Sequence, residues 1–285
     1  MADYELRPVD ATDAGLLPVV ALLAGVFPDA KHFTAEVLRW QYRLNPTGSA
    51  LGFNAWHGTE LVGHYATIPM LARVNGTVER GLLSLNTATA PAHQGKGLFT
   101  KLANATYALA ADAGYGFVAG VANLNSTPGF LRKLGFELVS PLRAMIGVGT
   151  LPRRDPEVIP AFAPVRDAAA IAWRVQHPAY PYSAYTEQGR SLVLSHRSQY
   201  GARFVMGELD APVPAAVLPQ EPGIVFGKVL IGLDPAMHWG GKAYVNIPMR
   251  FRPSPLNLIF KDLTGQGRTL DPRTVRWDPM DFDIL

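Results

Sequence analysis

One glycine-rich turn holds the residues of this chain whose types and spacing best suit chemistry. It reads Gln94-Gly-Lys-Gly-Leu-Phe-Thr100, after an apolar stretch at 82–88 with strand character and before a segment with helical spacing of Leu and Ala. Such a turn points backbone N–H groups outward, and the positive end of the following helix dipole adds to their attraction for an anion. The segment therefore predicts a phosphate-bearing ligand held by backbone rather than by metal.

Other phosphate and metal patterns do not fit. The chain lacks Gly-x4-Gly-Lys-Ser/Thr, and the dinucleotide pattern Gly-x-Gly-x-x-Gly has Thr100 where its third glycine belongs. The absence of cysteine removes disulfides, thiolate zinc ligands and a cysteine nucleophile. The seven histidines show no ligand spacing, so we expect no metal site.

The pattern that fits is Gln/Arg-x-x-Gly-x-Gly/Ala, with Gln94, Gly97 and, at its last position, Phe99. Together with Leu134-Gly-Phe136, these residues resemble the GNAT superfamily of N-acetyltransferases, over roughly residues 3–149. The resemblance implies that the loop binds the pyrophosphate of acetyl-CoA. Phe99 departs from the usual Gly or Ala, which should change packing against the cofactor more than the amide cradle.

The resemblance also assigns cofactor contacts by position. The strand before the loop would pair with the pantetheine arm, and polar residues after the next strand would lie near the sulfur. The implied contacts are Ala88, Thr89, Gln94, Gly95, Lys96, Gly97, Leu98, Phe99, Thr100, Asn123 and Ser126.

The catalytic candidates are His64, Asn86 and Asn123. His64 falls on a predicted central strand near the expected acceptor cleft, and an imidazole titrates near neutrality, so it is the candidate base. A buried structural histidine is the alternative. Asn86 is a further polar candidate for the cleft. The usual tyrosine acid of the family is absent, because Leu131 stands at its position.

Asn123 and Ser126 have two possible roles. The resemblance places Asn123 near the cofactor sulfur. Alternatively, Asn125 and Ser126 cap the helix that follows, which Thr127-Pro128 would start well.

A fold of the α/β class with a mixed sheet would position these residues. The pattern predicts a strand at 4–8, helices at 13–26 and 34–43 with Thr34 as a cap, a hairpin at 51–68, and a strand at 82–88. After the loop it predicts a helix, a strand at 116–121, a second short helix and a closing strand at 143–148. This order resembles the GNAT fold.

The chain is long enough for two domains. A proline-rich, charged segment at 151–160 marks the boundary between residues 1–150 and 151–285. Trp40-Gln-Tyr-Arg-Leu-Asn-Pro46 is echoed by Trp173-Arg-Val-Gln-His-Pro178, which indicates a duplication. The second half has no Gln-x-x-Gly-x-Gly loop. We therefore expect two tandem GNAT-like domains, of which the second is degenerate and serves the acceptor site or the structure.

Composition bears on the cellular location of the protein and on its partners. The chain has 285 residues, 48% of them hydrophobic and 17% charged, with a net charge of +3 and no long basic run, so we expect no nucleic-acid partner. The apolar stretch at 14–27 contains Pro18 and is too short to cross a bilayer. The start of the chain lacks the basic residues of a signal peptide. We expect a cytoplasmic monomer or homodimer with no membrane partner.

The expected function is direct transfer of acetyl from acetyl-CoA to a primary amine of a small molecule. Motifs including Gly63-His-Tyr65 and the final Asp281-Phe-Asp283 resemble a bacterial subgroup, some of whose members acetylate nucleotide-linked amino sugars. Leu131 keeps open a different class of function. This alternative is a non-catalytic acyl-CoA-binding sensor or scaffold.

Overall fold

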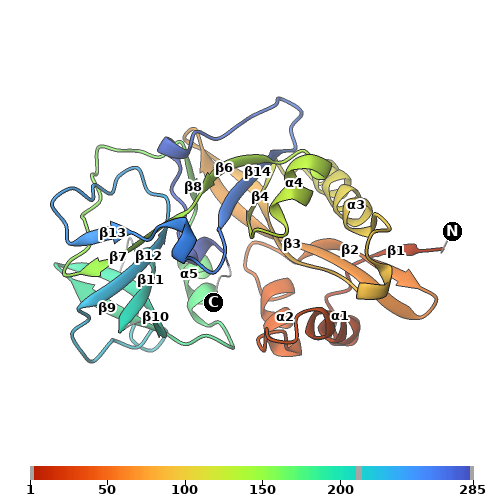
Figure 1. Ribbon diagram of the computed structural model, residues 1–285, viewed down its shortest axis with the longest axis horizontal. Coiled ribbons are helices and arrows are strands. Elements are labelled where there is room, and N and C mark those ends of the chain that lie inside the picture. Colours follow the sequence, from red (N-terminus) through yellow and green to blue (C-terminus); the bar gives the residue numbers. More distant parts are fainter. Residues whose placement is uncertain (1–2, 200, 210–213, 283–285) are drawn as a thin grey trace.

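The computed structural model describes residues 3–199, 201–209 and 214–282, which form two sheets side by side (Figure 1). Both sheets mix parallel and antiparallel pairs, which confirms the mixed α/β class. The first sheet has the order β1-β2-β3-β4-β5-β14-β6, and β8 pairs with β3. Its strands are β1 (Glu5–Pro8), β2 (Leu51–His57), β3 (Glu60–Val74), β4 (Thr77–Thr89), β5 (Phe117–Ala122), β6 (Glu137–Pro141), β8 (Phe162–Pro164) and β14 (Asn257–Asp262).

Helices cover both faces of this sheet (Figure 1). On one face, α1 (Asp13–Val26) and α2 (Ala35–Tyr42) share an apolar cluster with Leu83. On the other, α3 (Leu98–Asp112) and α4 (Thr127–Leu134) share a cluster with Leu82. Adjacent residues of a strand point to opposite faces, so β4 needs apolar residues at both positions. The predicted cap is confirmed, since the Thr34 side chain accepts a hydrogen bond from the backbone N–H of Val37.

The strands β4 and β5 lie parallel only at their beginning. Their pairing joins residues 81–84 of β4 to residues 117–120 of β5, and the rest of each strand diverges from the other. A bulge interrupts β4 just past this point. Between the pairs His64–Ala88 and Ala66–Leu85, β4 places Asn86 and Thr87 opposite a single residue of β3. Divergence and bulge together leave a length of β4 backbone outside the sheet ladder.

The second sheet has the order β13-β7-β12-β11-β10-β9. Its strands are β7 (Arg143–Val148), β9 (Tyr182–Glu187), β10 (Arg190–Gln199), β11 (Ala202–Leu209), β12 (Gly227–Gly232) and β13 (Tyr244–Asn246). The antiparallel series β9-β10-β11 followed by the parallel strand β12 repeats the arrangement of β2-β3-β4 and β5. One helix, α5 (Ala168–Val175), precedes the series as α2 precedes β2.

The two sheets exchange a strand. In the first sheet, β14 from the end of the chain lies antiparallel between β5 and β6. In the second, β7 from the first half lies antiparallel between β12 and β13. The expectation that residues 143–148 close the first sheet is therefore wrong, because β14 occupies the place that β7 would fill. The sheets do not separate at one point of the sequence, and the division into 1–150 and 151–285 stays a prediction.

A pair of tryptophans lies where the halves meet. The rings of Trp40 and Trp173 stack with centroids 4.4 Å apart. Each indole N–H donates to the backbone carbonyl of the other tryptophan, at 2.9 Å from Trp40 and 3.0 Å from Trp173. A reciprocal contact between equivalent residues is what an approximate two-fold axis produces. Together with the exchanged strands, this symmetry supports the duplication indicated by the Trp40 and Trp173 motifs.

The second half differs from the first at the place that corresponds to the divergence of β4 and β5. Residues 214–226, between β11 and β12, form no helix comparable to α3. Past the parallel pairing of β11 and β12, Trp277 instead joins Leu233 through two backbone hydrogen bonds of 2.8 Å. A Cβ on Gly232 would lie 2.3 Å from the Trp277 carbonyl oxygen, so this glycine allows the close approach. The chain's own segment thus fills this place, and the interpretation of the second half as a degenerate domain stays a prediction.

Candidate functional site

A cleft of about 570 Å³ opens where β4 and β5 diverge. Residues of β4, β5, α3, α4 and the connection between α1 and α2 surround it. Its lining includes Phe27, Ala30, His32, Phe33, Ser84, Leu85, Asn86, Thr87, Phe99, Gly120, Val121, Asn123, Asn125, Ser126, Gly129, Phe130 and Ile259. The cleft therefore brings together the predicted residues Asn86, Phe99, Asn123 and Ser126.

The glycine loop forms one end of α3. Gly95 and Gly97 have left-handed backbone with φ of +73° and +75°, and a Cβ on either would meet no atom within 4 Å. Gly97 is the N-cap of α3 and supplies no side-chain acceptor, so the first N–H groups of the helix face open space. Gln94 anchors the loop, since its side-chain amide donates to the Thr89 carbonyl at 3.3 Å. This geometry fits an anion held by backbone amides.

Packing against α4 explains how a residue as large as Phe99 fits at the last position of the motif. Its ring meets the Phe130 ring edge-on at 5.2 Å, and a Cβ on Gly129 would lie 3.0 Å from the Phe99 ring. The large residue at the last motif position is therefore accommodated by a glycine in α4. Leu98, also predicted as a contact, is buried in the apolar cluster of α3 and offers only its backbone N–H.

His64 lies behind the cleft and does not line it. Its Nδ1 donates to the Asn54 side-chain oxygen at 2.6 Å, and its Nε2 accepts from the Tyr42 hydroxyl at 2.8 Å. Complete burial lowers the pKa of His64 to about 3, so the imidazole is neutral near pH 7 and a weak base. Both nitrogens are engaged, and the geometry disfavours the predicted role as base.

Asn86 connects this buried network to the cleft. Its φ of +47° places it at the β4 bulge, and its side-chain amide donates to Gln41 at 2.7 Å and to the Tyr42 hydroxyl at 3.0 Å. Burial raises the pKa of Tyr42, so the phenol keeps its proton for His64. The network therefore fixes the bulge, and His64 is a positioning residue for Tyr42 and Asn86.

His32 is the histidine that lines the cleft. It lies between α1 and α2, with its ring 4.3 Å from the Phe33 ring and 5.9 Å from the ring of Tyr180 in the second half of the chain. The sequence did not indicate that His32 lines the cleft, because this residue stands in a short loop with no motif around it. Its position depends on packing between segments far apart in the sequence.

Asn123 and Ser126 share a turn before α4. The Asn123 side-chain oxygen accepts from the backbone N–H groups of Asn125 at 3.0 Å and Ser126 at 2.9 Å. Ser126 is the N-cap residue but makes no capping hydrogen bond through its side chain. The Ser126 side chain therefore does not cap α4, contrary to that alternative. The Asn123 side chain instead holds the turn in place.

Hydroxyl groups, rather than a residue at position 131, reach the cleft from the sheet. Ser84 lines the cleft, and its Oγ lies 2.8 Å from the Tyr65 hydroxyl, which lies 2.6 Å from the Tyr107 hydroxyl. Burial raises the pKa of Tyr65 to about 12, so this phenol is protonated near pH 7. Leu131 packs against the apolar cluster of α3 and α4.

One family model matches the part of the chain that contains most of the residues lining this cleft. Residues 7–139 match the family model described as an acetyltransferase (GNAT) domain, a span that contains the glycine loop, His32 and the α4 turn. No curated protein shows a significant match to the chain. In the part of the chain that the structure describes, no three side chains of His, Cys, Asp or Glu gather as metal ligands, and no helix has the length and apolar character of a membrane span.

Solved structures share the fold at low sequence identity. A probable N-acyltransferase from Enterococcus faecalis V583 is 10% identical with a TM-score of 0.62, over 92% of this chain and 73% of that one. A GCN5-related N-acetyltransferase from Kribbella flavida is 15% identical with a TM-score of 0.58, over 91% and 72%. Eis1 from Mycobacterium abscessus is 12% identical with a TM-score of 0.58, over 91% and 74%. The family model thus identifies a GNAT domain at residues 7–139, and these structures show that the chain shares their fold.

Proposed function

We propose that the protein is an N-acetyltransferase that moves acetyl from acetyl-CoA directly to a primary amine of a small molecule. The observation that carries the proposal is an open glycine loop at the start of α3, the helix whose Phe99 lines the cleft at the divergence of β4 and β5. The first suits a pyrophosphate, and the second offers free strand backbone to an extended arm. The match of residues 7–139 to a GNAT domain supports the same chemistry.

Different segments of the chain bind different parts of acetyl-CoA. Backbone amides from Gln94 to Thr100 bind the pyrophosphate, with Lys96 at the exposed tip of the loop. Ala88 and Thr89 offer β4 backbone to the pantetheine arm. The bulge at Asn86 leaves backbone polar groups outside the ladder, where they can polarise a carbonyl. Bound acetyl-CoA supplies the thioester, and the protein supplies proximity and orientation.

The reaction also needs one group that accepts a proton and one that donates a proton. The acceptor amine must lose a proton and the departing thiolate must gain one. His32 lines the cleft and is the candidate to accept the amine proton. The Ser84 hydroxyl, backed by Tyr65 and Tyr107, is the candidate donor to the thiolate in place of the missing tyrosine. His64, the base predicted from the sequence, orders Asn86 in this account.

The acceptor enters beside the connection of α1 and α2. Phe27, Phe33 and His32 line this side of the cleft, and Tyr180 brings the second half of the chain within reach of His32. A small-molecule amine suits such an apolar wall with one titratable group. A nucleotide-linked amino sugar is one acceptor of this class.

Release of free thiol from acetyl-CoA tests the proposal. Amino sugars, nucleotide-linked amino sugars, polyamines and peptide N-termini serve as separate acceptors, and mass spectrometry verifies acetylation of the amine. We expect turnover with at least one small-molecule class and none with Gly97→Glu. Gly76→Glu is the matched control, because Gly76 also has positive φ and open space but lies in the β3–β4 turn.

The non-catalytic sensor is the competing function. Its support is Leu131, which leaves the protein without the usual proton donor. Binding of CoA with no thiol release from any of the four acceptor classes would favour it over transfer.

A further inference from the structure

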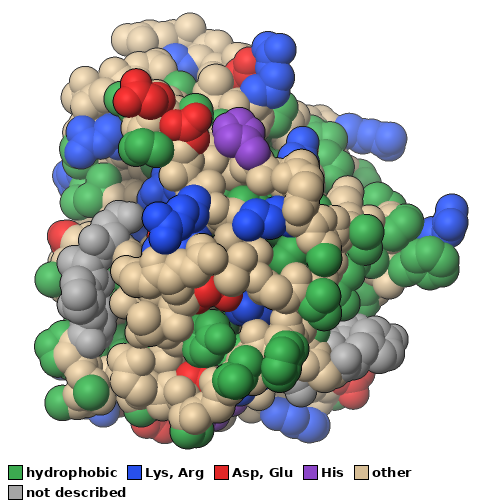
Figure 2. Space-filling view, turned by 90° about the vertical axis from the view of Figure 1, so that its left-hand side faces the viewer, with side chains coloured by type: hydrophobic (Ala, Val, Ile, Leu, Met, Phe, Trp, Pro, Cys, Tyr) green, Lys and Arg blue, Asp and Glu red, His purple; other side chains and the backbone are tan. Residues whose placement is uncertain are grey.

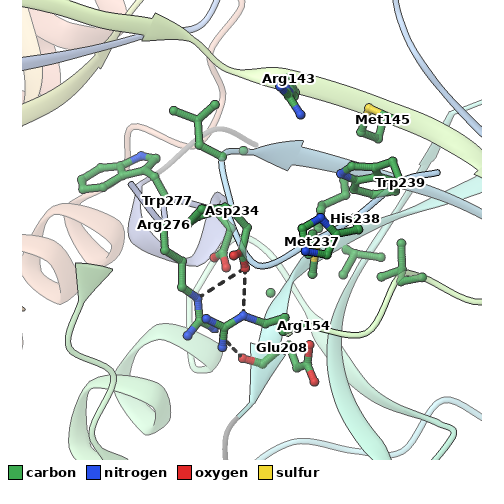
Figure 3. A pocket seen from close by; sticks show the side chains of 18 of the residues that line it. Arg143, Met145, Arg154, Glu208, Asp234, Met237, His238, Trp239, Arg276 and Trp277 are labelled. Atoms are coloured by element: carbon green, nitrogen blue, oxygen red, sulfur yellow. Dashed lines mark hydrogen bonds and ion pairs between the residues drawn. The ribbon is translucent and has the colours of Figure 1, made fainter. Parts of the chain in front are cut away.

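The second sheet carries a separate cavity of about 400 Å³ (Figure 3). Leu192, Val205 and Leu230, from three adjacent strands, form its apolar floor. α5 packs on the opposite face, in a cluster with Val193 and Met206. The cavity therefore lies on the face that corresponds to the α3 side of the first sheet, where residues 214–226 supply no helix.

This cavity is not a second copy of the acetyl-CoA site. The slot between β11 and β12 is closed by the backbone pairing of Leu233 with Trp277. A Cβ on Gly207 would lie 2.9 Å from the Asp278 carboxylate, so the segment around Trp277 packs tightly against β11 as well. No glycine loop adjoins the slot, because the chain has no second Gln-x-x-Gly-x-Gly pattern. A ligand in this cavity would therefore be bound by side chains rather than by the backbone amides of a glycine loop.

Arginines dominate the polar lining. Arg154 and Arg276 both face Asp234, with the Arg154 Nε 2.9 Å and the Arg276 Nε 4.0 Å from the same carboxylate oxygen (Figure 3). Arg143 extends from β7 on the opposite side of the cavity and takes part in no ion pair among the residues the structure describes (Figure 3). Basic side chains are also visible in the middle of the surface in Figure 2, which views this half of the molecule.

The other acidic residues of the lining are neutralised from outside it. Glu208 pairs with Arg190 at 3.3 Å, and Asp278 pairs with Arg166 at 2.7 Å. Neither of these arginines lines the cavity. Both carboxylates thus already have a partner, and Arg143 is the lining arginine that forms no ion pair with any residue the structure describes.

We propose that this cavity binds a small organic anion, with its carboxylate or phosphate at Arg143 and its apolar part on the Leu192–Val205–Leu230 floor beside Trp239. The volume suits a ligand of one or two rings. Guanidinium groups bind either oxyanion through charge-assisted hydrogen bonds. The position, on the second sheet and away from the glycine loop, makes it a site distinct from the proposed acetyl-CoA cleft.

Calorimetric titration of the full chain with naphthalene derivatives tests this proposal. We expect 1-naphthoate or 1-naphthyl phosphate to bind, the stronger of the two identifying the oxyanion. Cationic 1-naphthylmethylamine should not bind, and inorganic phosphate alone should bind at least tenfold more weakly than the better naphthyl anion. Equal binding of the cation would overturn the proposal, because it would mean that the apolar floor alone attracts the ring.

Variants locate the binding. Arg143→Gln should weaken binding of the naphthyl anion about tenfold, as expected for loss of one charge-assisted contact. Arg250→Gln, an exposed arginine outside the cavity, is the matched control and should change nothing. Gly97→Glu and an excess of CoA should also leave binding unchanged. Unaltered affinity in Arg143→Gln, or displacement by CoA, would contradict the assignment.

Discussion

At the scale of single residues, two histidines near the cleft differ in whether they can reach a ligand in it. His32 lines the cleft, whereas His64 is buried behind it between Asn54 and Tyr42. A base must reach the proton it removes, so position decides between them before pKa does. Burial also disqualifies His64 on pKa, because its neutral form binds protons weakly.

His32→Gln should lower kcat about 100-fold, because general-base catalysis typically contributes at least that much. The KM for acetyl-CoA should change little, since the glycine loop is untouched. Steady-state kinetics measure both effects, and an unchanged kcat in His32→Gln would assign the base elsewhere.

His64 should make stability sensitive to acid. Its pKa is about 3 in the fold and about 6.5 in an unfolded chain, so between these values only the unfolded chain binds the proton. Unfolding free energy should therefore fall as pH falls through this window, by up to about 1.4 kcal/mol per pH unit. Urea unfolding of His64→Gln should show a flatter dependence, whereas the exposed control His238→Gln should not. Equal slopes in all three proteins would contradict the buried neutral state.

At the scale of elements, the contact between α3 and α4 explains an unusual residue of the loop motif. Phe99 replaces the expected Gly or Ala and fills space that Gly129 leaves open. A protein interior is packed closely enough that such a pair should behave as one unit.

Gly129→Ala should destabilise the protein by about 1 kcal/mol, because the new Cβ would lie 3.0 Å from the Phe99 ring. Phe99→Ala should also destabilise it, through loss of packing against Phe130. The double variant should be more stable than the sum of the two effects predicts, because Ala at position 99 leaves room for the Cβ. Thermal unfolding of the four proteins completes the cycle, and strict additivity would show that the two positions are independent.

The sequence predicted elements better than it predicted their partners. Turn chemistry and apolar spacing correctly indicated α1, α2, the β2–β3 hairpin and the loop before α3. They did not indicate that β14 enters the first sheet, because apolar alternation marks a strand without identifying its neighbour. For the same reason the sequence did not indicate His32, whose place in the cleft depends on loop packing. Asn86 and Asn123, which the sequence did single out, also line the cleft, and their roles stay predictions.

At the scale of the whole molecule, the two halves are joined by exchange. β14 completes the first sheet and β7 completes the second, while Trp40 and Trp173 bond reciprocally between the halves. Each half therefore lacks a strand without the other. This arrangement allows one half to keep the glycine loop and the open cleft, while the other half closes the corresponding place with Trp277 and brings Tyr180 next to His32.

A fragment of residues 1–150 should not fold cooperatively. Without β14, the facing edges of β5 and β6 lose their ladder, and the apolar side chains of Leu258 and Phe260 leave the core. The full chain should unfold in one transition by calorimetry. A fragment with a sharp transition and acetyl-CoA binding would show that the first half is an independent domain.

We expect the glycine loop in the first half of the chain to bind one molecule of acetyl-CoA. Calorimetric titration of acetyl-CoA into the full protein tests it most directly, because stoichiometry and location are read together. We predict one site per chain, retained in Gly76→Glu and lost in Gly97→Glu. Two sites per chain, or undiminished binding in Gly97→Glu, would contradict the account.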